Sequence, residues 1–175
     1  MSSSILRSAR AVAFVALAAS SAFVVTGCGG GGDPKTAKVT AGPMPDGEEW
    51  AGVYFHPVYG YLHLVTEGSN IRGKWKRANG SHWGELSGTA GGNVAHFRWK
   101  EHQIGLVGAA ATSEGRGYFV YKVNKDNIGE LDGQFGLGAS EVGSDWHQIK
   151  QNKMKPDLNS VGGDAEGPSV GSDWK

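Results

Sequence analysis

Few residue patterns in this chain of 175 residues have the spacing that catalysis needs. The stretch Gly167-Pro-Ser-Val-Gly171 has the Gly-x-Ser-x-Gly spacing of a nucleophile elbow, in which a strained turn between a strand and a helix exposes the serine. Here the motif lies in a Gly- and Pro-containing stretch with no helical pattern after it. We therefore interpret it as a chance match.

Histidines and carboxylates are too scattered to predict a metal site or an acid–base pair. The histidines are His56, His63, His82, His96, His102 and His147. No His-x-His pair exists to chelate a metal from one face of a strand, and zinc needs three or four converging ligands. The carboxylates considered for acid–base work are Glu85, Glu101, Glu114 and Glu130. Nothing in their spacing forces a convergent pair. We expect surface histidines, no metal, no cofactor and no catalytic residue.

Aromatic residues are the best candidates for binding a ligand. The proposed ligand-binding residues are Trp75, Trp83, Phe97, Trp99 and Tyr118. Aromatic rings can stack on a sugar or line an apolar pocket. The alternative is packing, because the interior of an eight-stranded barrel is just wide enough for side chains to fill it.

Charge argues against a general nucleic-acid binder, since 17 Lys and Arg balance 17 Asp and Glu. A basic cluster, Arg72, Lys74, Lys76 and Arg77, alternates with Ile71 and Trp75. We interpret it as a solvated strand face, with an anionic partner such as a lipid headgroup or polysaccharide as the alternative.

The elements that position these residues are strands, because apolar residues recur with a period of two. Ile71, Gly73 and Trp75 share one face, and Ala95, Phe97 and Trp99 share another. Turn residues separate the predicted strands, which lie near 50–56, 60–66, 70–77, 83–90, 93–100, 104–112, 116–123, 128–136 and 144–150. No stretch predicts a helix. We expect an all-β fold, an antiparallel meander of eight or nine short strands closed into a small barrel.

A degenerate repeat of the form apolar-x-Gly supports the barrel. It occurs as Ile71-Arg-Gly73, Leu86-Ser-Gly88, Leu106-Val-Gly108 and Leu131-Asp-Gly133. An inward glycine lets strands curl and lets a neighbouring Trp lie over the backbone. In the regular spacing of their predicted strands and glycines, residues 50–150 resemble the up-and-down barrels of the lipocalin and avidin type, although neither family's ligand motif is present.

The N-terminus has the features of an export signal. Arg7 and Arg10 precede an uncharged run over residues 11–25, which is shorter than the roughly 20 residues of a membrane span. The sequence Val25-Thr-Gly-Cys28 resembles the lipobox of bacterial lipoproteins. That resemblance implies cleavage before Cys28, acylation of Cys28 with chains such as palmitate, and, because Gly29 follows, the outer membrane. An ordinary secretory signal or a short membrane anchor is the alternative.

The predicted organisation has four parts. These are a signal peptide over 1–27, a flexible Gly/Pro linker over 28–48, the β-barrel domain over 49–150 and a disordered tail over 151–175. The pentapeptide Val142-Gly-Ser-Asp-Trp146 recurs as Val170-Gly-Ser-Asp-Trp174. The second copy is either a duplicated, solvated end or a spare strand that could pair with a sheet edge.

Together these features predict a lipid-anchored envelope lipoprotein with a non-catalytic binding or scaffolding role, its domain in the periplasm or at the cell surface. One alternative is a carrier of an apolar or sugar-like molecule, which would have a hollow barrel with small residues such as Gly73, Gly88 and Ala110 facing the cavity. The other is an inhibitor or assembly factor acting on an envelope protein, which would have a packed barrel and exposed aromatics such as Trp83 or Tyr61.

Overall fold

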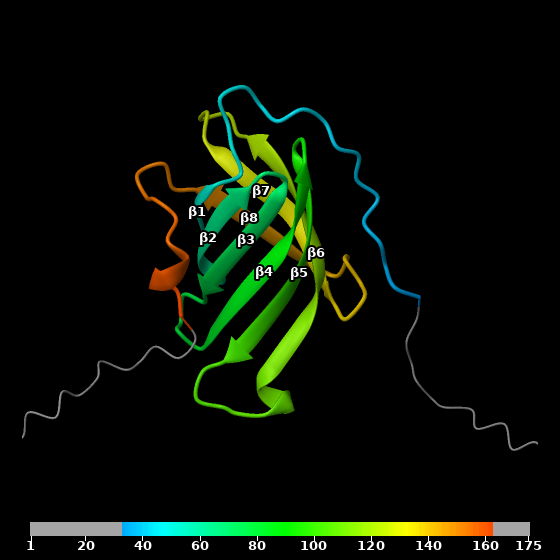
Figure 1. The fold of residues 1–175 in the computed structure, drawn as a ribbon, viewed down its shortest axis with the longest axis vertical. Helices are drawn as coiled ribbons and strands as arrows, with labels where there is room; N and C mark the ends of the chain where they lie inside the picture. Colours follow the sequence, from blue (N-terminus) through cyan, green and yellow to red (C-terminus); the bar gives the residue numbers. More distant parts are fainter. Residues whose placement is uncertain (1–32, 163–175) are drawn as a thin grey trace, which may run out of the picture. The chain divides into compact units, whose positions relative to one another are not determined.

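A computed structural model describes residues 33–162, which form eight antiparallel strands (Figure 1). The strands are β1 Gly52–His56, β2 Gly60–Glu67, β3 Asn70–Lys76, β4 His82–Gly91, β5 Val94–Gln103, β6 Thr112–Val123, β7 Gly129–Leu137 and β8 Ser144–Lys150. Two short 3₁₀ turns, η1 Ala109–Ala111 and η2 Leu158–Ser160, complete the described elements.

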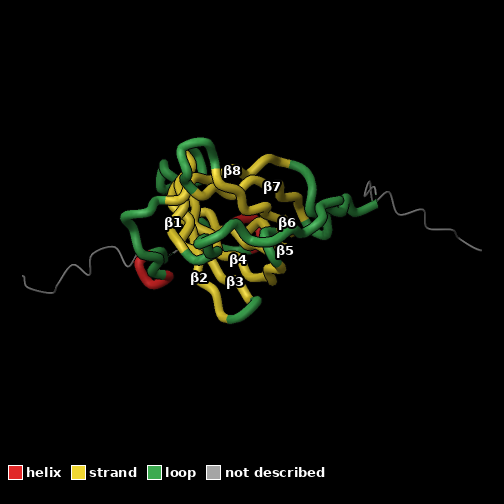
Figure 2. The backbone as a smooth tube through the Cα atoms, turned by 90° about the horizontal axis from the view of Figure 1, so that it is seen from above, coloured by secondary structure: helices red, strands yellow, loops and turns green. Residues whose placement is uncertain are grey.

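The strands form a closed barrel in chain order (Figure 2). Each strand pairs with the next, and β8 returns to β1 through the pairs Tyr54–Lys150 and Phe55–Ile149. The predicted all-β closed meander is therefore confirmed, with eight strands. The strand predicted over 104–112 was wrong: β5 and β6 run longer than expected, and most of that stretch is the loop between them.

The barrel interior is a packed aromatic core. The period of two assigned its faces correctly, since Ile71, Trp75, Phe97 and Trp99 are all buried. Trp146 lies at the centre, and its ring centroid lies within 6 Å of those of five aromatic neighbours, Tyr59, Trp75, Phe97, Phe119 and Phe135.

Glycines on facing strands make room for these rings. A Cβ atom on Gly84 would lie 2.2 Å from the Trp75 ring, and one on Gly117 would lie 2.7 Å from the Phe97 ring. These glycines let large rings lie against the neighbouring backbone. Neither belongs to the predicted apolar-x-Gly repeat. Of that repeat, Gly73, Gly88 and Gly133 lie in strands, whereas Gly108 was wrongly predicted and lies in the β5–β6 loop with nothing within 4 Å of its Cβ position.

The segment before β1 follows the barrel instead of hanging free as the predicted linker. The Lys35 carbonyl accepts a hydrogen bond from the Glu141 N–H, and the Gly42 N–H donates to Asn93 Oδ1 at 2.7 Å. Trp50 is buried, and its indole N–H donates to the Gly92 carbonyl. We call residues 35–50 the strap. Its composition suggested a free coil, but backbone hydrogen bonds to distant turns hold it in place.

Residues 151–162 also differ from the disordered tail that we predicted. They run along the outer side of β2, where Val161 is buried and the Asp157 N–H donates to His63 Nδ1 at 3.0 Å. The remaining tail, the Gly-x-Ser-x-Gly match and the second Val-Gly-Ser-Asp-Trp copy lie outside the described residues, as do the predicted signal peptide and Cys28. Among residues 33–162, no helix has the length and apolar character to cross a membrane.

Candidate functional site

The five predicted ligand-binding residues do not form one site. Trp75, Phe97 and Trp99 point into the barrel and are packed there. Trp83 and Tyr118 lie on the outer wall, where Trp83 stacks on His102 with ring centroids 4.4 Å apart and Tyr118 lies beside His96. Alternation along a strand places the two groups on opposite faces of the sheet.

The barrel has no room for a ligand of ordinary size. Inside the described part of the chain, the space among the core aromatics is a cavity of about 20 Å³, lined by Tyr59, Trp75, Arg77, Trp99, Glu101, Phe135 and Trp146. That is enough for about one water molecule. A Cβ atom on Gly73 would meet the Leu62 and Leu64 side chains, and one on Gly88 would meet the His96 carbonyl and Phe97. Ala110 lies in the exposed β5–β6 loop.

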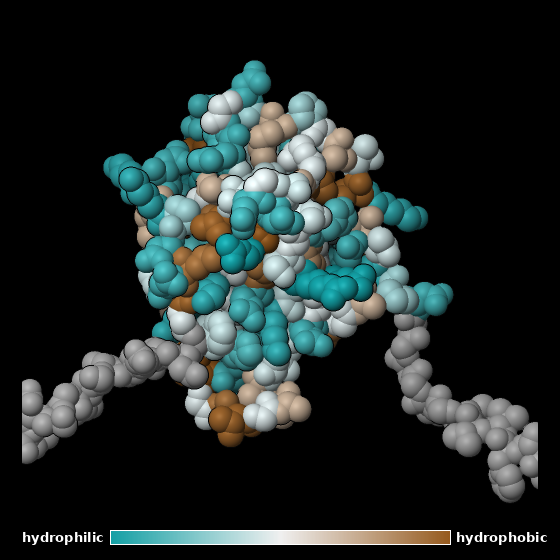
Figure 3. Space-filling model, viewed as in Figure 1, coloured by the Kyte–Doolittle hydropathy of each residue, from teal (hydrophilic) through white to brown (hydrophobic). Residues whose placement is uncertain are grey.

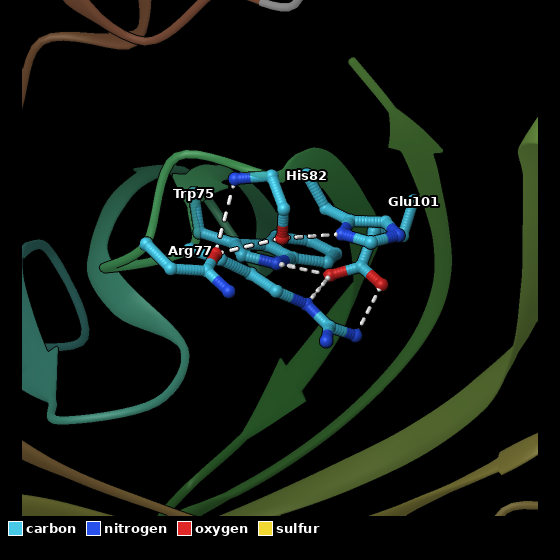
Figure 4. Close-up of polar contacts among 6 residues, drawn as sticks. Trp75, Arg77, His82 and Glu101 are labelled. Atoms are coloured by element: carbon cyan, nitrogen blue, oxygen red, sulfur yellow. Dashed lines mark hydrogen bonds and ion pairs between the residues drawn. The ribbon is translucent and has the colours of Figure 1, made fainter. Parts of the chain in front are cut away.

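A charged pair lies beside this cavity, at the end of the barrel where β3 leaves it (Figure 4). Glu101 is buried and accepts hydrogen bonds from Arg77 Nε at 2.8 Å, Arg77 Nη2 at 2.6 Å and the Trp75 indole at 3.2 Å. The bond to Glu101 raises the pKa of Arg77, so the guanidinium stays charged. Arg77 and the Trp75 indole therefore supply the hydrogen bonds that a buried carboxylate needs. We call Trp75, Arg77 and Glu101 the polar plug.

The pairing of Arg77 with Glu101 was not predicted, although the sequence contains a signal for it. Glu101 lies two residues beyond Trp99, so the period of Ala95, Phe97 and Trp99 places it on the inner face. An inward carboxylate needs a cation, and Arg77 supplies it. We had placed Arg77 in a solvated basic cluster instead.

A second polar cluster lies at the opposite end, under the strap. The Tyr121 hydroxyl donates to the Glu48 carboxylate, and Lys150 Nζ lies 3.1 Å from both Glu48 Oε2 and the Tyr121 oxygen. The hydrogen bond from Tyr121 and the nearby Lys150 lower the pKa of Glu48, while burial and Glu48 raise that of Tyr121. This cluster ties the strap to β6 and β8.

The outer wall carries a row of arginines across four strands. Arg72, Arg98 and Arg116 are exposed and lie in one register line, with Ser87 between the first two. They line a shallow open groove of about 620 Å³ together with His96 and Glu141. Among residues 33–162, Arg98 and Arg116 have no ion-pair partner, whereas Arg72 lies 3.9 Å from Glu67. We call Arg72, Arg98 and Arg116 the arginine row.

Two of the histidines are not the surface residues that we predicted. His63 is buried under the C-terminal segment, and desolvation lowers its pKa. His102 lies in β5, stacked on Trp83, and its Nε2 atom is buried with no hydrogen-bond partner in the described structure. Within residues 33–162, no three His, Cys, Asp or Glu side chains gather as metal ligands would.

The candidate acid–base carboxylates do not meet in one cleft. Glu101 is inside the barrel, while Glu85 and Glu114 lie exposed on the outer wall on either side of Lys100. Glu130 faces outward from β7, opposite Lys122 on β6. These four carboxylates therefore do not form the convergent pair that acid–base catalysis would need.

Comparisons with protein-family models, with curated proteins and with solved structures find no match for this chain.

Proposed function

We propose that this chain is a lipid-anchored protein of the bacterial cell envelope whose barrel is a rigid, non-catalytic scaffold that binds partners through its outer surface. One observation carries the proposal: the barrel interior is filled, leaving about 20 Å³. Ligand pockets for small molecules are usually about 300–1,000 Å³. A packed interior with functional groups outside is what a binding or scaffolding module requires, and it gives less support to a carrier.

Support for the envelope comes from the N-terminal sequence. The lipobox-like Val25-Thr-Gly-Cys28 follows an uncharged run, and Cys28 is the only cysteine of the chain. Acylation at Cys28 would attach the barrel to the outer membrane. The domain then works in the periplasm or at the cell surface.

Two mass measurements on the full chain, produced in a bacterial host, test this proposal. We expect the purified chain to begin at Cys28 and to carry acyl groups there, and Cys28→Ser to remain unprocessed. We also expect native and denatured masses to agree, because a filled barrel retains no small molecule. An unmodified Cys28 would overturn the anchor, and a retained apolar or sugar-like ligand would favour the carrier.

A second candidate function is recognition of an anionic ligand on the outer wall. Arg98 and Arg116 lie directly opposite each other, and like charges in that position cost stability. An anionic group between them would remove the repulsion and accept charge-assisted hydrogen bonds.

Binding of a sulfated oligosaccharide, measured by calorimetry at rising salt, tests the second candidate. The double variant Arg98→Gln, Arg116→Gln is expected to lose about tenfold in affinity. Lys125→Gln, in the β6–β7 turn, is the matched control. Equal affinities for all three proteins would exclude the arginine row as the site.

A further inference from the structure

The loop between β5 and β6 exposes apolar side chains that a water-soluble surface would normally bury. Ile104, Leu106 and Val107 are 37%, 54% and 98% exposed. Residues 104–113 contain no charged side chain. The loop lies at the tip of a long hairpin (Figure 1), and Figure 3 shows apolar atoms gathered at that tip. Such a patch marks a contact with a partner or a membrane.

The backbone holds this loop in a defined shape. Gly105 and Gly108 have φ values of 85° and 99°, which favour glycine, and they flank Leu106 and Val107. The Ile104 N–H donates to the Ser81 carbonyl at 2.9 Å, and the Ala111 N–H donates to the Gly108 carbonyl at 3.0 Å. The two apolar side chains are therefore presented outward by hydrogen-bonded backbone.

Other exposed apolar residues lie at the same end of the barrel. This end holds the β1–β2, β3–β4, β5–β6 and β7–β8 connections, and we call it the apolar end. Val58, Tyr61 and Leu137 are 57%, 44% and 70% exposed and lie in or beside these connections. Of the large apolar residues exposed among residues 33–162, only Ile149 and Met154 lie elsewhere. The strap starts at the β7–β8 connection and reaches the opposite end, where Gly42 and Trp50 bond the β4–β5 turn.

The chain leads toward the predicted anchor from the apolar end. Lys35 is hydrogen-bonded to Ser140 and Glu141 in the β7–β8 connection. Lys35 is seven positions after Cys28, so the chain between them spans at most about 25 Å. A lipid on Cys28 would therefore hold the β7–β8 connection, and with it the apolar end, close to the bilayer.

We propose that the β5–β6 loop inserts Leu106 and Val107 into the bilayer that holds the lipid anchor, so that the apolar end faces the membrane. This inference rests on the proposed lipid anchor. The occupant is a lipid surface because the loop is uncharged, and the driving force is apolar burial that does not depend on lipid charge. Trp83, half-buried beside His102 near the base of the loop, has the amphipathic ring that suits the headgroup region.

Depth-dependent fluorescence quenching tests the insertion. Full chains carrying Val107→Cys or Lys125→Cys are labelled with a thiol dye and reconstituted into phosphatidylcholine vesicles with a quencher in the acyl chains. We expect quenching at position 107 and none at position 125, which lies in a turn at the opposite end. A vesicle-bound chain whose dye at position 107 is not quenched overturns the insertion and leaves the anchor standing.

The same samples report separately on the anchor. An acylated Cys28 has no free thiol, so one dye per chain is expected; two dyes per chain would overturn the proposed anchor. The loop is then tested without lipid on a chain that begins at residue 29 and therefore lacks both the apolar run over residues 11–25 and Cys28. The barrel contacts described above begin at Lys35, so this chain keeps all of them. We expect Leu106→Asp to lower its vesicle partitioning by about tenfold or more. Met154→Asp in the same chain is the matched control, since Met154 is also exposed but lies away from the apolar end. Equal partitioning of all three overturns the insertion.

Discussion

At the scale of single residues, two carboxylates at the ends of the barrel are distinctive because each has defined partners. Glu101 is held by Arg77 and the Trp75 indole, and Glu48 by Tyr121 and Lys150. The two clusters lie at opposite ends of the barrel. They replace water at the two places where an eight-stranded barrel would otherwise be open to solvent.

Removing the Glu101 carboxylate tests the first cluster. Glu101→Ala leaves the Trp75 N–H and part of the Arg77 charge without partners, so we expect a loss of about 2–3 kcal/mol in the free energy of unfolding. We expect a value near the lower of these two figures, because Arg77 is partly exposed and solvent screens its charge. Urea unfolding measures the change. Glu85→Ala on the outer wall should change it by less than about 0.5 kcal/mol, and an equal effect of the two variants would contradict a role for the plug.

His63 predicts a pH dependence of stability. Burial lowers its pKa from 6.5, and its Nδ1 must be unprotonated to accept from the Asp157 N–H. As pH falls below about 6.5, the unfolded chain takes up a proton before the folded chain does, so stability is full above that pH and declines below it. His63→Gln should show a smaller decline between pH 7 and 5 than the parent chain, by thermal unfolding. His82→Gln, which leaves the contact intact, should keep the parent profile.

At the scale of elements, cross-strand pairs of a large ring with a glycine build the core. Trp75 is opposite Gly84, and Phe97 is opposite Gly88 on one side and Gly117 on the other. At Gly84 and Gly117 a ring occupies the space that a Cβ atom would take, and at Gly88 the His96 carbonyl and Phe97 occupy it, so a side chain at any of the three would force its neighbour to move.

A pair of glycine variants in β4 tests this packing. Gly84→Ala should destabilise the barrel by about 1–3 kcal/mol, since the new Cβ overlaps the Trp75 ring. Gly91→Ala is the matched control in the same strand, because nothing lies within 4 Å of its Cβ position. Urea unfolding with tryptophan fluorescence compares the two. Equal stability of both variants would show that the Trp75 ring can move aside.

At the scale of the whole molecule, segments before and after the barrel cover its surface. The strap is fixed at the β7–β8 connection and at the β4–β5 turn before it enters β1. Residues 151–162 cover β2. Among the surfaces that stay exposed, we assign binding to the arginine row and the apolar end.

Hydrogen exchange tests the attachment of the strap. Asn93 accepts from the Gly42 N–H through its side chain and also donates to the Tyr121 carbonyl. In Asn93→Ala we expect faster exchange of the Gly42 amide, by about tenfold for a lost hydrogen bond of about 1.4 kcal/mol, while amides of β5 stay protected. Asn79→Ala, in the β3–β4 turn, is the control. Unchanged exchange at Gly42 would mean that the Asn93 side chain does not hold the strap.

The local alternation of apolar and polar residues predicted most of the strands correctly. Alternation at Ile71–Trp75 and Ala95–Trp99 assigned both the strands and their inner faces, because a strand exposes successive side chains to opposite sides. The same alternation places Glu101 on the inner face, two residues beyond Trp99. It failed at Ile104–Gly108, where a short apolar run predicts a strand whether or not a partner strand lies beside it.

The sequence alone therefore determined the strands, their faces and an antiparallel meander, because these follow from neighbours two residues apart. Only the tertiary structure decided that the barrel is filled, that Arg77 pairs with Glu101, that residues 35–50 and 151–162 lie on the wall, and that Leu106 and Val107 protrude. Each of these depends on which distant segments lie side by side. A local pattern carries no information about such contacts until the barrel closes and fixes them.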